Sequence, residues 1–113
     1  MRDIFQKTIS EPVSFEGIGL HYGVKSKINL LPASENEGII FIRKDLTTNN
    51  KIIANYKNVS SARLCTTLTN SHNVSVSTVE HLMAAFYLTG IDNIKVEIDN
   101  SEVPIMDGSS KEF

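Results

Sequence analysis

The chain has 113 residues, of which 41% are hydrophobic and 21% charged, a composition typical of one globular domain. Its formal net charge is -2 and its lysines and arginines are scattered, so no basic field favours binding to nucleic acid or anionic lipid. A single cysteine excludes an intramolecular disulfide framework. The first seven residues contain no apolar stretch of the kind found in signal peptides, and the sequence has no apolar run of about 20 residues, so we expect a cytoplasmic protein without an integral membrane segment.

Strands are predicted for the first part of the chain. Residues 7–15 are compatible with an edge strand that Pro12 interrupts. The three glycines of GIGLHYG, residues 17–23, predict a loop. Polar and apolar residues then alternate over 25–30, which is typical of a half-exposed strand, and this strand is predicted to end at Pro32.

Further strands are predicted up to the middle of the chain. Residues 38–43 are the most apolar candidate, and 52–56 are a weaker one. The segments 64–68 and 74–77 flank the polar sequence TNSHN, which is typical of a hairpin connection. The histidine of this connection is most simply a solvated turn residue.

One complete helix is predicted, over residues 78–89. Ser77 is a natural N-cap, and Glu80 stands three residues later, at the spacing of a capping box. Gly90 supplies the C-terminal stop. The helix is therefore expected to begin with reciprocal hydrogen bonds between Ser77 and Glu80.

A helical wheel divides this helix into two apolar faces. The first is predicted to pack on the sheet, and it consists of Val79, Leu82, Met83 and Phe86. The second lies nearly opposite and consists of His81, Ala84, Ala85 and Leu88. Surface helices usually carry charges on their outer face, so we expect another part of the protein to cover the second face.

The last part of the chain is predicted to add strands and to begin a second helix. Residues 93–98 alternate as an amphipathic strand, and 103–106 are extended. Ser109 and Glu112 have the capping-box spacing of a helix start, followed by the apolar Phe113. A helix of one turn is not stable alone, so we expect the natural chain to continue.

Glu80 and His81 are the candidates for chemistry. Glu80 considered alone is most simply a helix cap, and His81 a half-buried histidine. The alternative is a zinc ligand beside a general base, because a water molecule polarised by zinc needs a carboxylate close by to take its proton. The adjacent pair is a weak signal, since it lacks the HExxH arrangement in which two ligands share one helix.

Three segments, taken together, resemble a known family. They are GIGLHYG at 17–23, STVEHLMAA at 77–85 and EVPIMDGS at 102–109. In these segments, and in LCTT at 64–67 and GIDNI at 90–94, the chain is similar to the UDP-3-O-acyl-N-acetylglucosamine deacetylases. These are the zinc enzymes that commit bacteria to lipid A synthesis.

The resemblance implies roles for matching positions. It makes His81 a zinc ligand and Glu80 the base that activates the attacking water. Leu20 and His21 match a segment that borders the active-site opening, and Cys65 matches a cysteine that faces the site. These three residues are therefore expected to lie beside the substrate.

The resemblance also implies the fold and a missing part. The fold is α+β, a two-layer sandwich with a small, mainly antiparallel sheet backed by helices, similar to a ribosomal S5 domain 2-like layer. Residues 1–113 are expected to be the first of two such domains and to be incomplete, since the second helix is cut soon after its start near residue 109. In the family, the second domain supplies a histidine and an aspartate as further zinc ligands, another catalytic histidine, and the passage for the acyl chain.

The chain alone is expected to be inactive. Catalytic zinc sites use three protein ligands, so one histidine should bind Zn2+ poorly. The complete enzyme is expected to hydrolyse the acetamide of UDP-3-O-(3-hydroxyacyl)-N-acetylglucosamine, while the uncovered helix face drives self-association of the isolated chain. The alternatives are a non-catalytic module that binds a sugar nucleotide or a partner, and a nucleic-acid-binding α/β domain, which the net charge disfavours.

Overall fold

A computed structural model of the protein describes residues 6–19, 23–55, 58–61 and 66–105. Within these residues the fold is α+β, with a six-stranded mixed sheet, a smaller three-stranded sheet and one helix. The elements of the large sheet are β1 (Val13–Gly19), β2 (Lys25–Pro32), β3 (Ile39–Arg43), β4 (Lys51–Ile53), β8 (Ile94–Ile98) and β9 (Pro104–Ile105). The others are β5 (Val59–Ser61), β6 (Thr67–Thr69), β7 (Ser75–Ser77) and the helix α1 (Glu80–Thr89).

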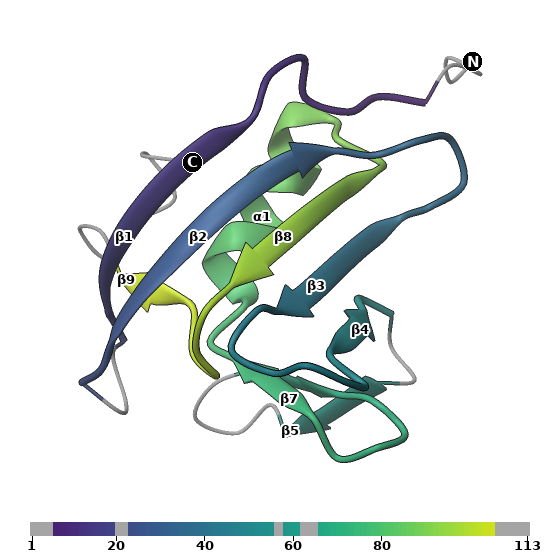
Figure 1. Cartoon of the computed structure of the whole chain (residues 1–113). Coiled ribbons are helices and arrows are strands. Elements are labelled where there is room, and N and C mark those ends of the chain that lie inside the picture. Colours follow the sequence, from purple (N-terminus) through teal and green to yellow (C-terminus); the bar gives the residue numbers. More distant parts are fainter. Residues whose placement is uncertain (1–5, 20–22, 56–57, 62–65, 106–113) are drawn as a thin grey trace.

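The large sheet has the strand order β4-β3-β8-β2-β1-β9. Its neighbouring strands are antiparallel except for β3 and β8, which run parallel. The parallel pair brings residues 39–43 beside residues 94–98, with the small sheet and α1 between them in the chain. Helix α1 lies across one face of the large sheet, and the small sheet lies at one end of it (Figure 1).

The alternation predicted for residues 25–30 is confirmed, and the alternation predicted for 93–98 is confirmed from Ile94 onward, since Asn93 precedes the strand and is buried. In β2, Ser26, Ile28 and Leu30 are buried while Lys25 and Lys27 are exposed. Strand β8 buries every second residue in the same way. The apolar side of both strands joins α1 in one core, whose largest side chains are Ile28, Phe41, Ile52, Leu82, Phe86, Ile94 and Ile98. Burying each contributes about 1.5–3 kcal/mol relative to exposure.

The predictions for the first strand and the glycine-rich loop were partly wrong. Strand β1 begins at Val13, directly after Pro12, and continues through Gly17 to Gly19 instead of ending at residue 15. Gly17 pairs with Ser26, and Gly19 pairs with Pro104, so part of the predicted loop is an inner strand of the sheet. Glycine is usually unfavourable in strands, but here the neighbouring strands β2 and β9 supply hydrogen-bonding partners on both sides of β1.

Helix α1 begins two residues later than predicted, and the predicted capping box was wrong. The N-cap is Val79, which makes no side-chain capping hydrogen bond. Ser77 is instead the last residue of β7, and its backbone pairs with residues 101–103. The predicted stop is confirmed, because Gly90 has a φ of 73° and its N–H donates to the carbonyl oxygens of Phe86 and Tyr87.

The two predicted faces of α1 are confirmed except at Ala85. Val79, Leu82 and Phe86 are buried against the sheet, and Met83 is half-buried. Ala85 is also buried, although it was predicted to lie on the outer face. The outer face carries the exposed His81, Ala84 and Leu88, together with Tyr87. Leu88 is 76% exposed and Tyr87 is 85% exposed, so this face has no cover from the described residues.

The predicted hairpin is confirmed and belongs to the small sheet. Strands β6 and β7 pair antiparallel on either side of the turn at residues 70–74. The third strand of this sheet, β5, was not predicted, because its three residues are too few to show a period. The second helix predicted from Ser109 lies outside the described residues.

Candidate functional site

Glu80, the predicted general base, is the first residue of α1 and is held by the backbone of Thr66, which directly precedes β6. Its Oε2 accepts a hydrogen bond of 2.9 Å from the backbone N–H of Thr66. Its Oε1 is buried and has no hydrogen-bond partner among the described residues. A buried carboxylate oxygen without a donor is costly, so such an atom is a candidate for contact with a ligand, an ion or water.

His81, the predicted zinc ligand, follows directly and has an exposed side chain. Consecutive helical residues differ by about 100° in direction, so Glu80 and His81 share the first turn without facing the same way. The helix packs by its other side, which leaves the imidazole free to meet a group from outside the described residues. The first turn of α1 therefore presents an imidazole and a carboxylate from consecutive residues.

Three segments of the family resemblance meet at this end of the helix. Ser77 forms a parallel bridge with Glu102, and Val103 donates to the Ser77 carbonyl oxygen at 3.0 Å. Strand β1 pairs with β9 through Ile18 and Gly19. Segments 17–19, 77–81 and 102–105 are therefore neighbours, although they lie far apart in sequence. The remaining predicted site residues, Leu20, His21 and Cys65, lie outside the described residues.

Thr66 was missed by sequence reasoning as a contributor to the site. Its N–H holds the Glu80 carboxylate, and its carbonyl oxygen accepts hydrogen bonds from Thr78 at 2.8 Å and Val79 at 3.4 Å. These contacts use the backbone, so no side-chain pattern could have revealed them. The nearest available signal was the position of Thr66 directly after Cys65.

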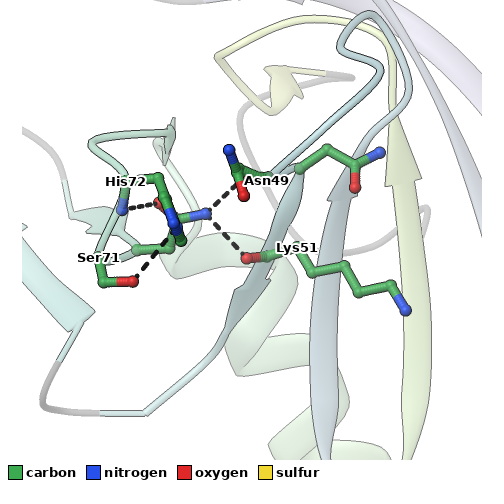
Figure 2. Close-up of a pocket in the computed structure, with 6 residues that line it drawn as sticks. Asn49, Lys51, Ser71 and His72 are labelled. Carbon is green, nitrogen blue, oxygen red and sulfur yellow. Dashed lines mark hydrogen bonds between the residues drawn. The ribbon is translucent and has the colours of Figure 1, made fainter.

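His72 lies away from this site, as predicted. It lines a depression of about 330 Å³ between the β6–β7 turn and the β3–β4 turn. Figure 2 shows His72 and Ser71 on one side of this depression and Asn49 and Lys51 on the other. The amide of Asn70 joins the two turns by donating to the carbonyl oxygens of Asn49 and Lys51 at 2.8 and 3.0 Å. His72 is exposed, and its Nδ1 lies 3.3 Å from the Ser71 hydroxyl, so it is a solvated turn residue.

The described residues do not assemble a metal centre by themselves. No group of three or more His, Cys, Asp or Glu side chains among them could hold a metal ion. Zinc needs about three protein ligands, so His81 would have to be joined by ligands from elsewhere. The donor set does fit a part of a zinc site, since the exposed imidazole of His81 follows directly after Glu80, whose Oε1 has no donor within the part of the chain that the structure describes. As to membranes, no described helix is long and apolar enough to span one.

Comparison with known proteins adds the identity of the family. A family model described as UDP-3-O-acyl N-acetylglycosamine deacetylase matches residues 6–113. Proteins named UDP-3-O-acyl-N-acetylglucosamine deacetylase are similar over nearly the whole chain. The relative from Pseudoalteromonas atlantica is 50% identical over 110 residues, and that from Sodalis glossinidius is 49% identical over 110 residues.

These alignments cover nearly all of this chain but only about a third of each relative. They include 97% of this chain but 36% of each of the two relatives. A relative from Shewanella loihica is 46% identical over 107 residues, and that alignment includes 95% of this chain and 35% of the relative. The chain thus spans just over a third of the length of the relatives it matches. Since the family model matches almost every residue, the chain belongs to the UDP-3-O-acyl N-acetylglycosamine deacetylase family.

Proposed function

We propose that this chain is the amino-terminal part of a zinc-dependent deacetylase. Its substrate is UDP-3-O-(3-hydroxyacyl)-N-acetylglucosamine, whose acetamide it hydrolyses in the committed step of bacterial lipid A synthesis. The observation that carries the proposal is the Oε1 of Glu80, which is buried and has no donor among the described residues, beside the exposed His81. Membership of the family supports it, because the relatives are named for this activity.

The proposed site is shared between this chain and a second domain. His81 would hold Zn2+ together with a histidine and an aspartate of that domain, because catalytic zinc sites use three protein ligands. When bound, zinc polarises the amide carbonyl and makes water more acidic. The chain by itself would then bind zinc poorly and hydrolyse no substrate.

Glu80 is the proposed general base. Its carboxylate accepts a proton from the attacking water, and the resulting oxygen–carbon bond forms at the acetamide carbonyl. The carbon–nitrogen bond then breaks, and a histidine of the second domain protonates the leaving amine. The products are acetate and the free amino sugar nucleotide, so every atom of the consumed water is accounted for.

The hydrogen bond from Thr66 suits this role. A backbone N–H fixes Oε2 without consuming Oε1, so one oxygen orients the carboxylate and the other stays available to water. Leu20, His21 and Cys65 are proposed to line the substrate side of the site, on the strength of the family resemblance. Their segments adjoin Gly19 and Thr66, which lie near the start of α1.

The proposed complete protein has two similar layers with the site between them. Each layer is a small sheet backed by helices, of the ribosomal S5 domain 2-like kind. The uncovered outer face of α1 supports this arrangement, because a second layer would bury Leu88 and Tyr87. We place the complete enzyme in the bacterial cytoplasm, with a UDP-sugar substrate and no nucleic-acid partner.

Turnover by the complete gene product tests the proposal. The purified protein, supplied with zinc, is incubated with UDP-3-O-(3-hydroxyacyl)-N-acetylglucosamine, and acetate and free amine are followed by proton NMR. We expect the two products in equal amounts, and none from residues 1–113 alone. Substrate binding without any acetate release by the complete protein would favour the non-catalytic sugar-nucleotide module instead.

A further inference from the structure

We propose that Thr78 and Glu102 are a buried pair of positioning residues that sets how α1 begins. The Thr78 hydroxyl donates to Oε2 of Glu102 at 2.6 Å, across 24 positions of sequence. Thr78 is 5% exposed and Glu102 is 2% exposed. A short hydrogen bond to a buried carboxylate is among the stronger hydrogen bonds of proteins. The inference rests on the proposed function, because it takes Glu80 and His81 to be the groups that are positioned.

The backbone of Thr78 explains why such a contact is needed. Its φ is 61°, in the left-handed region that a β-branched residue rarely adopts. This conformation turns the chain sharply from β7 into α1. Strained residues of this kind persist when the surrounding contacts over-determine them. Here the Thr78 N–H donates to the Thr66 carbonyl oxygen at 2.8 Å, and the side chain is held by Glu102.

Glu102 is itself held in place by the chain around it. Ser77 pairs with it in a parallel bridge, and the Ser77 N–H donates to the Ser101 carbonyl oxygen at 2.8 Å. A Cβ atom at Gly19 would overlap with Oε1 of Glu102 and lie 2.9 Å from its Cδ. The carboxylate therefore occupies the space that any side chain at residue 19 would fill.

One carboxylate thus joins three separate segments. Gly19 ends β1 and leads to Leu20, Thr78 leads to the start of α1, and Glu102 leads to β9. These are the segments of the family resemblance, and no functional role was assigned to Thr78 or Glu102 from the sequence. Their meeting point is buried and polar, and Glu102 is the charged residue type among the buried polar residues Ser26, Ser77, Thr78, Asn93 and Glu102, which argues for a role in orientation.

The Thr78 turn can affect catalysis because it lies close in sequence to Glu80 and His81. Two residues separate the Thr78 turn from His81, so a change in the Thr78 dihedral angles swings the whole first turn. Glu80 would then move relative to the Thr66 N–H that holds its carboxylate. Misplacing a catalytic group by about 1 Å can cost ~10²-fold in rate. Thr78 and Glu102 act through Glu80 and His81, so they are positioning residues and not catalytic ones.

The test compares three variants of the complete enzyme. Thr78→Val keeps the branched shape and removes the hydroxyl, whereas Thr78→Ser keeps the hydroxyl. Thr89→Val is the matched control, because the Thr89 hydroxyl donates to the Ala85 carbonyl oxygen at 2.7 Å at the other end of the same helix. We expect Thr78→Val to lower kcat by about 10-fold or more with KM within about 3-fold.

The other two variants separate orientation from stability. Thr78→Ser should keep kcat within about 3-fold of the parent, since the hydrogen bond survives. Thr89→Val should lower the unfolding temperature while leaving kcat unchanged. A Thr78→Val enzyme that is folded and has the kcat of Thr89→Val would overturn the proposal.

A fourth variant and a second kind of measurement cover the case in which Thr78→Val does not fold. Glu102→Gln keeps the side-chain volume but replaces the carboxyl group by an amide, and it should lower kcat with KM little changed. Hydrogen exchange of the Thr78 and Val79 amides should become faster in Glu102→Gln and stay unchanged in Thr89→Val. Hydrogen exchange does not depend on turnover, so the two proposals can fail separately. A parent enzyme that is inactive would refute the proposed function alone. Unchanged amide exchange in Glu102→Gln would refute the positioning pair.

Discussion

The backbone N–H of Thr66 donates a hydrogen bond of 2.9 Å to the carboxylate of Glu80, 14 residues further along the chain. This contact replaces the helix cap that the local sequence predicts for Glu80. It leaves the second carboxylate oxygen buried and without a donor among the described residues. A buried carboxylate oxygen without a donor is costly, so it is a candidate for contact with a ligand, an ion or water.

Glu80→Gln in the complete enzyme should remove turnover while keeping the fold. The glutamine carbonyl oxygen can still accept from Thr66, but the amide cannot take a proton from water. Loss of a general base costs about 10²–10⁴-fold in kcat. Glu97→Gln is the matched control, because Glu97 lies on β8 and forms an ion pair of 3.7 Å with Lys44. Equal kcat values for the two variants would show that Glu80 is structural.

Replacing His81 should lower the zinc content of the complete enzyme. His81→Ala removes one of the proposed protein ligands, so metal analysis after dialysis should find less zinc per protein molecule. His72→Ala is the control, because His72 is an exposed turn residue beside Ser71. If both variants retain the zinc of the parent, His81 is not a ligand.

Residues 1–113 expressed alone should self-associate or unfold easily. The outer face of α1 exposes Leu88 and Tyr87, and large exposed apolar patches favour association. Leu88→Lys should reduce the association measured by sedimentation velocity. Ile53→Lys is the control, since Ile53 is 52% exposed on β4 and not on α1. A stable monomer of the parent chain in dilute solution would mean that this face needs no cover.

The ion pair of Arg43 and Asp45 should stabilise the protein in a pH-dependent way. The Arg43 guanidinium donates to both carboxylate oxygens, at 2.9 and 2.6 Å, and to the Ser75 carbonyl oxygen at 2.9 Å. The hydrogen bond from Arg43 is the main cause that lowers the pKa of Asp45 below its ordinary value of 3.8. Because the folded pKa is the lower one, the stabilisation is fully present above the unfolded pKa and is lost as pH falls through the folded pKa.

Asp45→Asn should therefore unfold at a lower temperature than the parent at neutral pH. The difference should shrink as the pH is lowered below 3.8, where the parent carboxylate becomes protonated. Thermal unfolding followed by circular dichroism across this range measures it. The exposed pair of Lys25 and Glu16, 3.2 Å apart, supplies the control variant Glu16→Gln, which should change little. A constant difference for Asp45→Asn at all pH values would contradict the assignment.

The sequence by itself determined those strands and helices whose side-chain pattern repeats over a few neighbouring residues. The alternation of β2 and β8 sets which side chains face the core, because residues two apart share one side of a strand. The body of α1 and its end at Gly90 follow from helical spacing and from a glycine that accepts a positive φ. The motif segments likewise identified the family, and with it the candidates Glu80 and His81.

The tertiary structure decided the contacts that join distant segments. Strand β1 runs on through Gly17 and Gly19, and Thr78 adopts a left-handed conformation against its local preference. Glu80 turns from its expected capping partner to Thr66, and the Thr78 hydroxyl turns to Glu102. Such partners lie 14 and 24 residues away, and local propensity carries no information about them. Burial decides these cases, because a polar group inside the core must take whichever partner the packed strands bring within reach.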